Sequence, residues 1–108
     1  MISVSIKRNK AGRICGFELI GHGEQDLVCP AVSLLALNTV NSIEALTDES
    51  LNCDHNPEGG YLKLELPHII EGNHNPEADI LLESFALGLR SVKETYNNQI
   101  ELKDDKHD

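Results

Sequence analysis

Long apolar runs are missing from this chain, and so is a basic leader followed by an apolar stretch. A helix that crosses a membrane needs about 18 or more consecutive apolar residues, and no segment of the 108-residue sequence reaches that length. The first residues alternate apolar and polar side chains, which is not the pattern of a secretory signal. We therefore expect no membrane insertion and a cytoplasmic location.

Cysteine is scarce as well. The three cysteines, Cys15, Cys29 and Cys53, are an odd number and form no CxxC pair, so they do not provide a disulfide framework. Free thiols are typical of a reducing compartment. Cys53 and His55 would share one side of a strand, but two ligands without a third and fourth at recognisable spacing make a poor metal site. We predict no metal and no other cofactor.

Basic residues are few. The chain has 9 Lys and Arg against 18 Asp and Glu, and its formal net charge is −9. Such a surface repels phosphate backbones, and no dense Lys/Arg cluster offsets it. We therefore predict no direct nucleic-acid binding. The same charge would attract a basic protein partner, although acidic surfaces also occur simply because they favour solubility.

Periodicity predicts the elements. Apolar and polar residues alternate over 2–7, 13–20, 51–55, 61–66 and 99–103, as in half-buried strands. Two stretches show helical spacing. The first, from Pro30 to Leu46, carries Val32, Leu35, Ala36, Thr39, Val40, Ile43 and Leu46; the second, opened by the cap residue Asn75 and Pro76, carries Ala78, Leu81, Leu82, Phe85, Leu89, Val92 and Tyr96.

This order predicts an α+β fold in which two helices pack on one mostly antiparallel sheet, in the order ββαββαβ. Residues 1–103 would form a single domain. Residues 67–75 would be a polar connection, and residues 104–108 a charged, disordered tail.

The stretch from Gly21 to Ser33 holds the candidate chemistry. Pro30 fits the first position of a helix, which makes Cys29 the cap residue, next to unpaired backbone N–H groups and the positive end of the helix dipole. These groups favour thiolate over thiol, and they can also hydrogen-bond the oxyanion of a bound acyl group. A helix-start cysteine is, however, often only a small buried hydrophobe.

His22 lies seven residues before Cys29 and has a glycine on either side. The glycines permit a sharp exit from the preceding strand, so loop 23–28 can fold back and bring the imidazole to the sulfur. A Cys–His pair of this kind can act as nucleophile and general acid/base. The alternative is a histidine that is merely solvated.

Gly21-His22-Gly23 followed by Asp-Leu-Val-Cys-Pro-Ala-Val-Ser over 26–33 resembles the motif of the ribosomal-processing cysteine proteases, the Prp or YsxB-like family. The resemblance runs from Ile2 to about Leu102. It implies an endopeptidase that removes the N-terminal extension of a basic large-subunit ribosomal protein precursor, the twenty-seventh, with Phe before the cut and a small residue after it. It also implies a homodimer.

Residue by residue, the resemblance places His22 on the catalytic His and Cys29 on the nucleophile. Asp26 and Ser33 fall on motif positions of unassigned role. Asp26 is the nearest candidate for a third catalytic residue, but we favour a helix-capping role. Ser33 could bond within the site or back to the helix, and we favour the second. Compared with the family motif, the loop after His22 is shorter, Gly23 replaces a common Ala, and Pro30 replaces a small residue.

The leading hypothesis is therefore a cysteine endopeptidase. The alternative is a non-enzymatic, acidic, ribosome-associated binding module that keeps the motif without turnover. Thiol reactivity distinguishes the two, because a catalytic Cys29 should alkylate below the pH at which ordinary thiols react.

Overall fold

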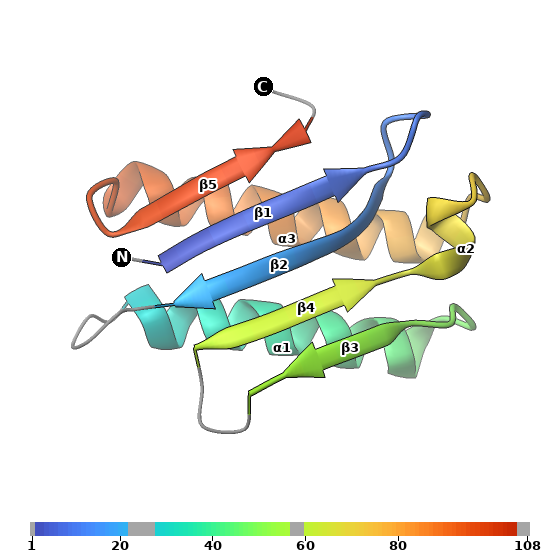
Figure 1. Ribbon diagram of the computed structural model, residues 1–108, viewed down its shortest axis with the longest axis horizontal. Helices are drawn as coiled ribbons and strands as arrows, with labels where there is room; N and C mark the ends of the chain where they lie inside the picture. The colour runs from blue at the N-terminus through green and yellow to red at the C-terminus, as the bar shows by residue number, and fades with distance from the viewer. Residues whose placement is uncertain (1, 22–27, 57–59, 106–108) are drawn as a thin grey trace.

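The computed structural model describes residues 2–21, 28–56 and 60–105, with the backbone alone for residues 28 and 29. All five strands lie in one layer, and the two long helices lie together behind it (Figure 1). The elements are β1 (Ile2–Arg8), β2 (Ile14–Gly21), α1 (Val28–Leu46), β3 (Asn52–His55), β4 (Tyr61–Glu65), α2 (Pro67–Ile70), α3 (Pro76–Thr95) and β5 (Ile100–Asp104).

The strands form one sheet in the order β3-β4-β2-β1-β5. The β1–β2, β2–β4 and β3–β4 pairs are antiparallel, and β5 runs parallel to β1. The predicted α+β class with a mostly antiparallel sheet is confirmed. The short helix α2 is an addition to the predicted order.

The core lies between the sheet and the two long helices. Alternate strand residues point into it, and the apolar stripes of α1 and α3 cover them. Phe17 of β2 meets Phe85 of α3 with ring centroids 4.3 Å apart. The largest fully buried side chains are Phe17, Phe85, Ile2, Ile6, Ile14, Ile43, Leu64, Leu66, Leu82, Leu89, Ile100 and Val4.

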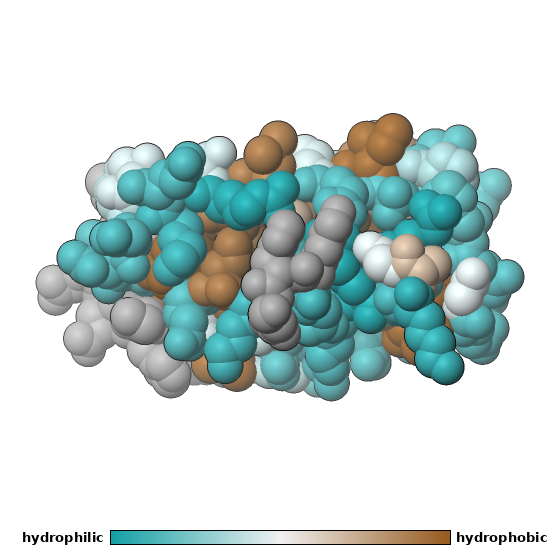
Figure 2. Space-filling view, turned by 90° about the horizontal axis from the view of Figure 1, so that it is seen from above, coloured by the Kyte–Doolittle hydropathy of each residue, from teal (hydrophilic) through white to brown (hydrophobic). Residues whose placement is uncertain are grey.

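The other face of the sheet carries mainly polar side chains. Ser5, Glu18 and Lys63 stand next to one another in the β1, β2 and β4 register, one residue out of step with the buried set. Seen from the β5 edge, most visible side chains are hydrophilic and the hydrophobic ones form small separate patches (Figure 2). The sheet therefore buries one face, as its sequence alternation predicts.

Both helical stripes end earlier than predicted. Leu46, the last residue of α1, is 69% exposed, and Tyr96, the C-cap of α3, is 40% exposed. The apolar spacing continues at these positions, although among the described elements none buries these two side chains. The start of α3 agrees with the prediction, because the Asn75 side chain accepts a hydrogen bond from the Ala78 N–H and Pro76 is the first helical residue.

Two predictions near the chain's second half are corrected. Residues 67–75 are not only a polar connection, because Pro67 opens the one-turn helix α2 and Ile69 is buried. Asp104 does not belong to a disordered tail. It ends β5, is buried, and accepts a hydrogen bond from Arg8 Nε at 2.7 Å. Residues 106–108 lie outside the described part of the chain.

Candidate active site

Of the four predicted site residues, His22 and Asp26 lie outside the described residues. Cys29 is described by its backbone only, and it is the second residue of α1. The helix therefore begins at Val28, two residues before the predicted start, so Cys29 lies in the first turn and is not the cap. Backbone N–H groups of a first turn lack partners within the helix. Unpaired N–H groups that could bind an anion are therefore expected beside Cys29 whether it is the cap or a first-turn residue.

The end of β2, which leads to His22, is held from both sides. Gly21 pairs with Ile2 of β1, and its N–H donates to the Gly60 carbonyl at 2.9 Å. Gly60 has a φ of +90°, a conformation that L side chains rarely adopt, and it begins the return of the chain into β4. The strand thus delivers the chain to residue 22 from a fixed point.

A pocket of about 370 Å³ opens between α1 and the β3–β4 hairpin. Its lining residues are Leu19, Ser33, Ala36, Leu37, His55, Asn56, Gly60, Tyr61 and Leu62. Ser33 lies four residues after Cys29 on α1, and Gly60 is bonded to the residue before His22. The pocket therefore borders α1 one turn after Cys29, and it borders the residue that is hydrogen-bonded to Gly21.

The floor of the pocket is apolar and the polar groups lie around it. Leu19, Leu37 and Leu62 supply much of the apolar lining. The Tyr61 hydroxyl donates to Glu18 at 3.2 Å on the open face of the sheet, and its pKa is raised by partial desolvation and by this bond. His55 was considered in the sequence only beside Cys53. Its place in the pocket follows from its pairing with Leu62, which sequence spacing does not reveal.

Ser33 is half-buried and lines the pocket. On the same helix, Thr39 and Thr47 donate from their hydroxyls to the carbonyls of Leu35 and Ile43, each at 2.8 Å. The corresponding acceptor for Ser33 would be the carbonyl of Cys29, and the favoured interpretation of Ser33 as a residue bonded back to its helix stays a prediction.

The two described thiols are poor nucleophiles. Burial is the main cause that raises the pKa of Cys15 above its ordinary value. Partial burial and the carboxylates of Glu44 and Asp54 raise the pKa of Cys53. At a given pH each thiol therefore has a smaller thiolate fraction than a free cysteine, which is the opposite of what an activated nucleophile needs.

The part of the chain that the structure describes contains no group of three or more His, Cys, Asp or Glu side chains arranged to hold a metal ion. Cys53 and His55 do share a side of β3, opposite Leu64 and Leu62, as their spacing predicts. In the same described residues, no helix has the length and apolar character needed to cross a membrane.

Comparison with known proteins decides the family. The family model described as "Cysteine protease Prp" matches residues 1–101. The chain belongs to the Prp family of cysteine proteases. Bacillus subtilis ribosomal processing cysteine protease Prp is 28% identical over 105 residues, which cover 93% of this chain and 94% of that protein. The Staphylococcus aureus Prp is 29% identical, with 94% and 97% covered.

Solved structures agree with the Prp family. The S. aureus ribosomal processing protease Prp, in complex with a covalently linked product peptide, superposes with a TM-score of 0.86 at 28% identity, covering 97% of this chain and all of that one. A Streptococcus mutans protein is 31% identical with a TM-score of 0.81, covering 96% and 93%. As a Prp-family member the chain is a peptide-bond hydrolase of the ribosomal-processing class, so the non-enzymatic alternative is not supported.

Proposed function

We propose that Cys29 is the nucleophile and His22 the general acid and base of this protease. The observation that carries the proposal is the position of the pocket between Ser33, which lies one turn after Cys29, and Gly60, which is bonded to Gly21. A peptide seated there would pass the first turn of α1, to which Cys29 belongs.

The chemistry is acyl transfer in two steps. The Cys29 thiolate attacks the carbonyl carbon, the C–N bond breaks, and His22 gives its proton to the departing amine. A thioester remains on Cys29. Water then attacks the thioester carbonyl while His22 takes a proton from this water. The C–S bond breaks, which releases the carboxylate product and restores the thiolate.

Backbone N–H groups of the first turn of α1 would hold the oxyanion. Helix α1 begins at Val28. Pro30, the residue after Cys29, has no N–H to donate. The donors would therefore be the N–H groups of the other residues in the first turn. Preorganised donors of this type commonly contribute a large share of the rate enhancement. Asp26 would cap the helix, and Ser33 would face the substrate.

The pocket would receive one side chain of the bound peptide. Ser33 lies four helical residues, about 6 Å, from Cys29 along α1, so the pocket that Ser33 lines is within reach of a large side chain on the residue whose carbonyl Cys29 attacks. The resemblance to Prp proteases puts a Phe before the cut, and an apolar floor suits such a side chain. The S. aureus relative has been solved with a substrate peptide.

The proposed substrate is a basic ribosomal protein precursor that carries an N-terminal extension, the twenty-seventh large-subunit protein in the resemblance. Its positive charge complements the net charge of −9. The proposal extends to a homodimer in the cytoplasm that makes no direct nucleic-acid contact.

The test is cleavage of this precursor by the purified protein. Wild type should remove the extension, whereas Cys29→Ala and His22→Ala should leave the precursor intact. Cys53→Ala and His74→Ala are matched controls outside the proposed dyad and should cleave at the wild-type rate. Intact precursor with wild type, or cleavage by Cys29→Ala, would contradict the proposed function.

A further inference from the structure

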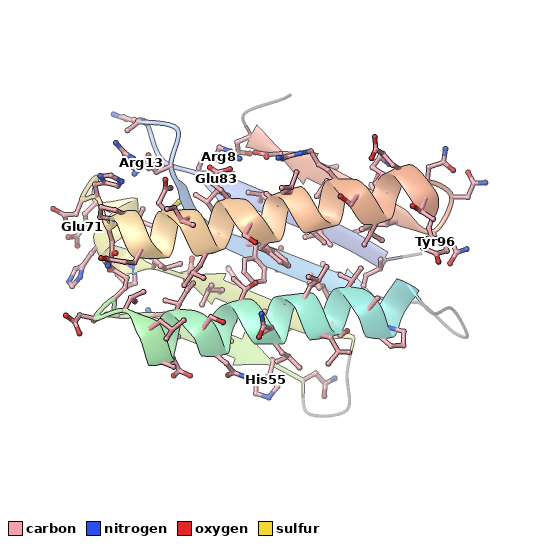
Figure 3. All side chains as sticks on the ribbon, turned by 180° about the vertical axis from the view of Figure 1, so that it is seen from behind. Arg8, Arg13, His55, Glu71, Glu83 and Tyr96 are labelled. Carbon is pink, nitrogen blue, oxygen red and sulfur yellow. The ribbon has the colours of Figure 1, made fainter. Side chains whose placement is uncertain are left out.

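His55 stands at the rim of the apolar pocket. It ends the edge strand β3, opposite Leu62 of β4, which is in turn opposite Leu19 of β2. All three side chains therefore lie on the sheet face that carries α1. Figure 3 shows His55 beside α1, on the side away from α3. Its exposed imidazole thus lies next to a floor made of leucines.

Few charged groups face His55. Residues 33–41 of α1, which run along the pocket, contain no charged residue. Asp54 precedes His55 on the strand, but it is paired with Lys63 and points to the open face. On the helix side, the carboxylate of Glu44 acts on Cys53, which lies two residues before His55 on the same side of β3. Glu58 lies outside the described residues.

Among the described lining residues, His55 and Tyr61 are the two that can ionise. The Tyr61 hydroxyl is engaged with Glu18 on the opposite face of the sheet. His55 is therefore the ionisable group that the described chain directs to the pocket. An imidazole has at least one N–H donor in either charge state, but it has an acceptor nitrogen only when neutral.

We propose that His55 is a specificity-determining residue, which donates a hydrogen bond to a carboxamide or carboxylate side chain of the peptide substrate beside the side chain that fills the pocket. This inference rests on the proposed protease site. An extended peptide advances about 3.3 Å per residue and its side chains alternate in direction. With one side chain on the leucine floor, another passes the rim where the imidazole lies.

The test varies the substrate and the enzyme together. Peptides carry Gln, Glu or Met, which are similar in length, at each of three positions on either side of the cut. The kcat/KM values are compared for wild type, for His55→Phe, which keeps a ring without the donors, and for His74→Phe. His74 is an exposed histidine near the start of β2, at the far end of that strand from the pocket.

At one position, wild type and His74→Phe should prefer Gln or Glu over Met by about threefold to tenfold, as one net hydrogen bond provides. His55→Phe should lose that preference and cleave the Met peptide within about twofold of wild type, consistent with a lost contact at constant fold. A higher rate for the Glu peptide than for the Gln peptide identifies a carboxylate, and a higher rate for the Gln peptide identifies a carboxamide. Because both peptides use the same catalytic pair, its contribution cancels in the ratio of their rates.

Binding of the same peptides to Cys29→Ala and to Cys29→Ala/His55→Phe, followed by fluorescence anisotropy, separates this inference from the proposed catalysis. A preference that depends on His55 in binding, without turnover by wild type, would reject the catalytic proposal and support the present one. Equal rates and affinities for all three peptides at every position, or a preference that survives His55→Phe, would overturn the role of His55.

Discussion

Arg8 shows how one side chain joins three parts of the fold. Its side chain is 3% exposed, its Nε lies 2.7 Å from Asp104 Oδ1, and its Nη1 lies 2.6 Å from Glu83 Oε2. Figure 3 shows Arg8 and Glu83 side by side. The hydrogen bond to Asp104, with the further one to Glu83, raises the pKa of Arg8 above its ordinary value. The guanidinium thereby fastens β5 and α3 to β1.

Replacing Arg8 with Met should lower the free energy of unfolding by about 3–5 kcal/mol, because it leaves the buried Asp104 carboxylate without its main partner. Arg90, at 3.9 Å and partly exposed, compensates only in part. Urea denaturation measures the change. Arg13→Met is the control, since the Arg13–Asp79 contact is 3.9 Å long and partly exposed; it should cost less than about 1 kcal/mol. Equal losses in both variants would contradict this account of the Arg8 network.

The thiols give a second prediction at the residue scale. Raised pKa values mean a smaller thiolate fraction at any given pH, so iodoacetamide should modify Cys15 and Cys53 slowly at pH 6–7 and faster only as the pH rises beyond their ordinary pKa of about 8.5. Cys29 should be modified first, and His22→Ala should slow it. Peptide mapping by mass spectrometry reports each site. Equal labelling of the three thiols at pH 6.5 would count against a Cys–His pair.

At the scale of elements, two glycines occupy opposite environments. A Cβ on Gly16 in β2 would lie 2.5 Å from the Leu64 carbonyl oxygen of β4, closer than atoms pack. A Cβ on Gly88 in α3 would lie 3.5 Å from the Leu35 methyl groups of α1, an ordinary contact. The first glycine permits the close approach of two strands, whereas the second leaves room between two helices.

Gly16→Ala should therefore destabilise the protein by about 1–3 kcal/mol, because the strands must move apart. Gly88→Ala should stabilise it by up to about 1 kcal/mol, because alanine favours the helix and restricts the unfolded chain. Thermal unfolding of the two variants tests both signs. A stabilised Gly16→Ala variant would show that the β2–β4 contact is looser than described.

The elements also show how far the sequence can be interpreted alone. Strands and long helices could be predicted because their apolar periods of 2 and 3.6 residues reflect a single buried side. The cap at Asn75 could be predicted as well, because its bond to Ala78 joins residues that are close in the sequence. Asp104 was placed in a tail because it lies in a charged segment. Its partner in the fold, Arg8, is far away in the chain, so the local sequence does not reveal the ion pair that buries it. His55 lines the pocket because it is paired with Leu62 across the β3–β4 hairpin. That register cannot be deduced from the spacing of residues in the sequence.

At the scale of the whole molecule, net charge affects how fast the protein meets its substrate. The net charge of −9 should speed association with a basic precursor at low salt, and this attraction is screened within about 10 Å at 0.1 M and about 3 Å at 1 M ionic strength. Raising the salt from about 50 to about 500 mM should lower kcat/KM for the precursor by about tenfold. A short uncharged peptide with the same cleavage sequence is the control and should change little. A parallel decline for both substrates would indicate an effect on the enzyme itself.

The placement of β1 between β2 and β5 affects how the protein is made. Ile2 is paired with Ile100, so the first strand to leave the ribosome gains its second neighbour only after almost a hundred further residues have been synthesised. Until then, one edge of β1 has no strand beside it and is open to pairing with other nascent chains. Completion of the fold is therefore a late event, and fragments that stop before residue 100 should depend on chaperones to stay monomeric.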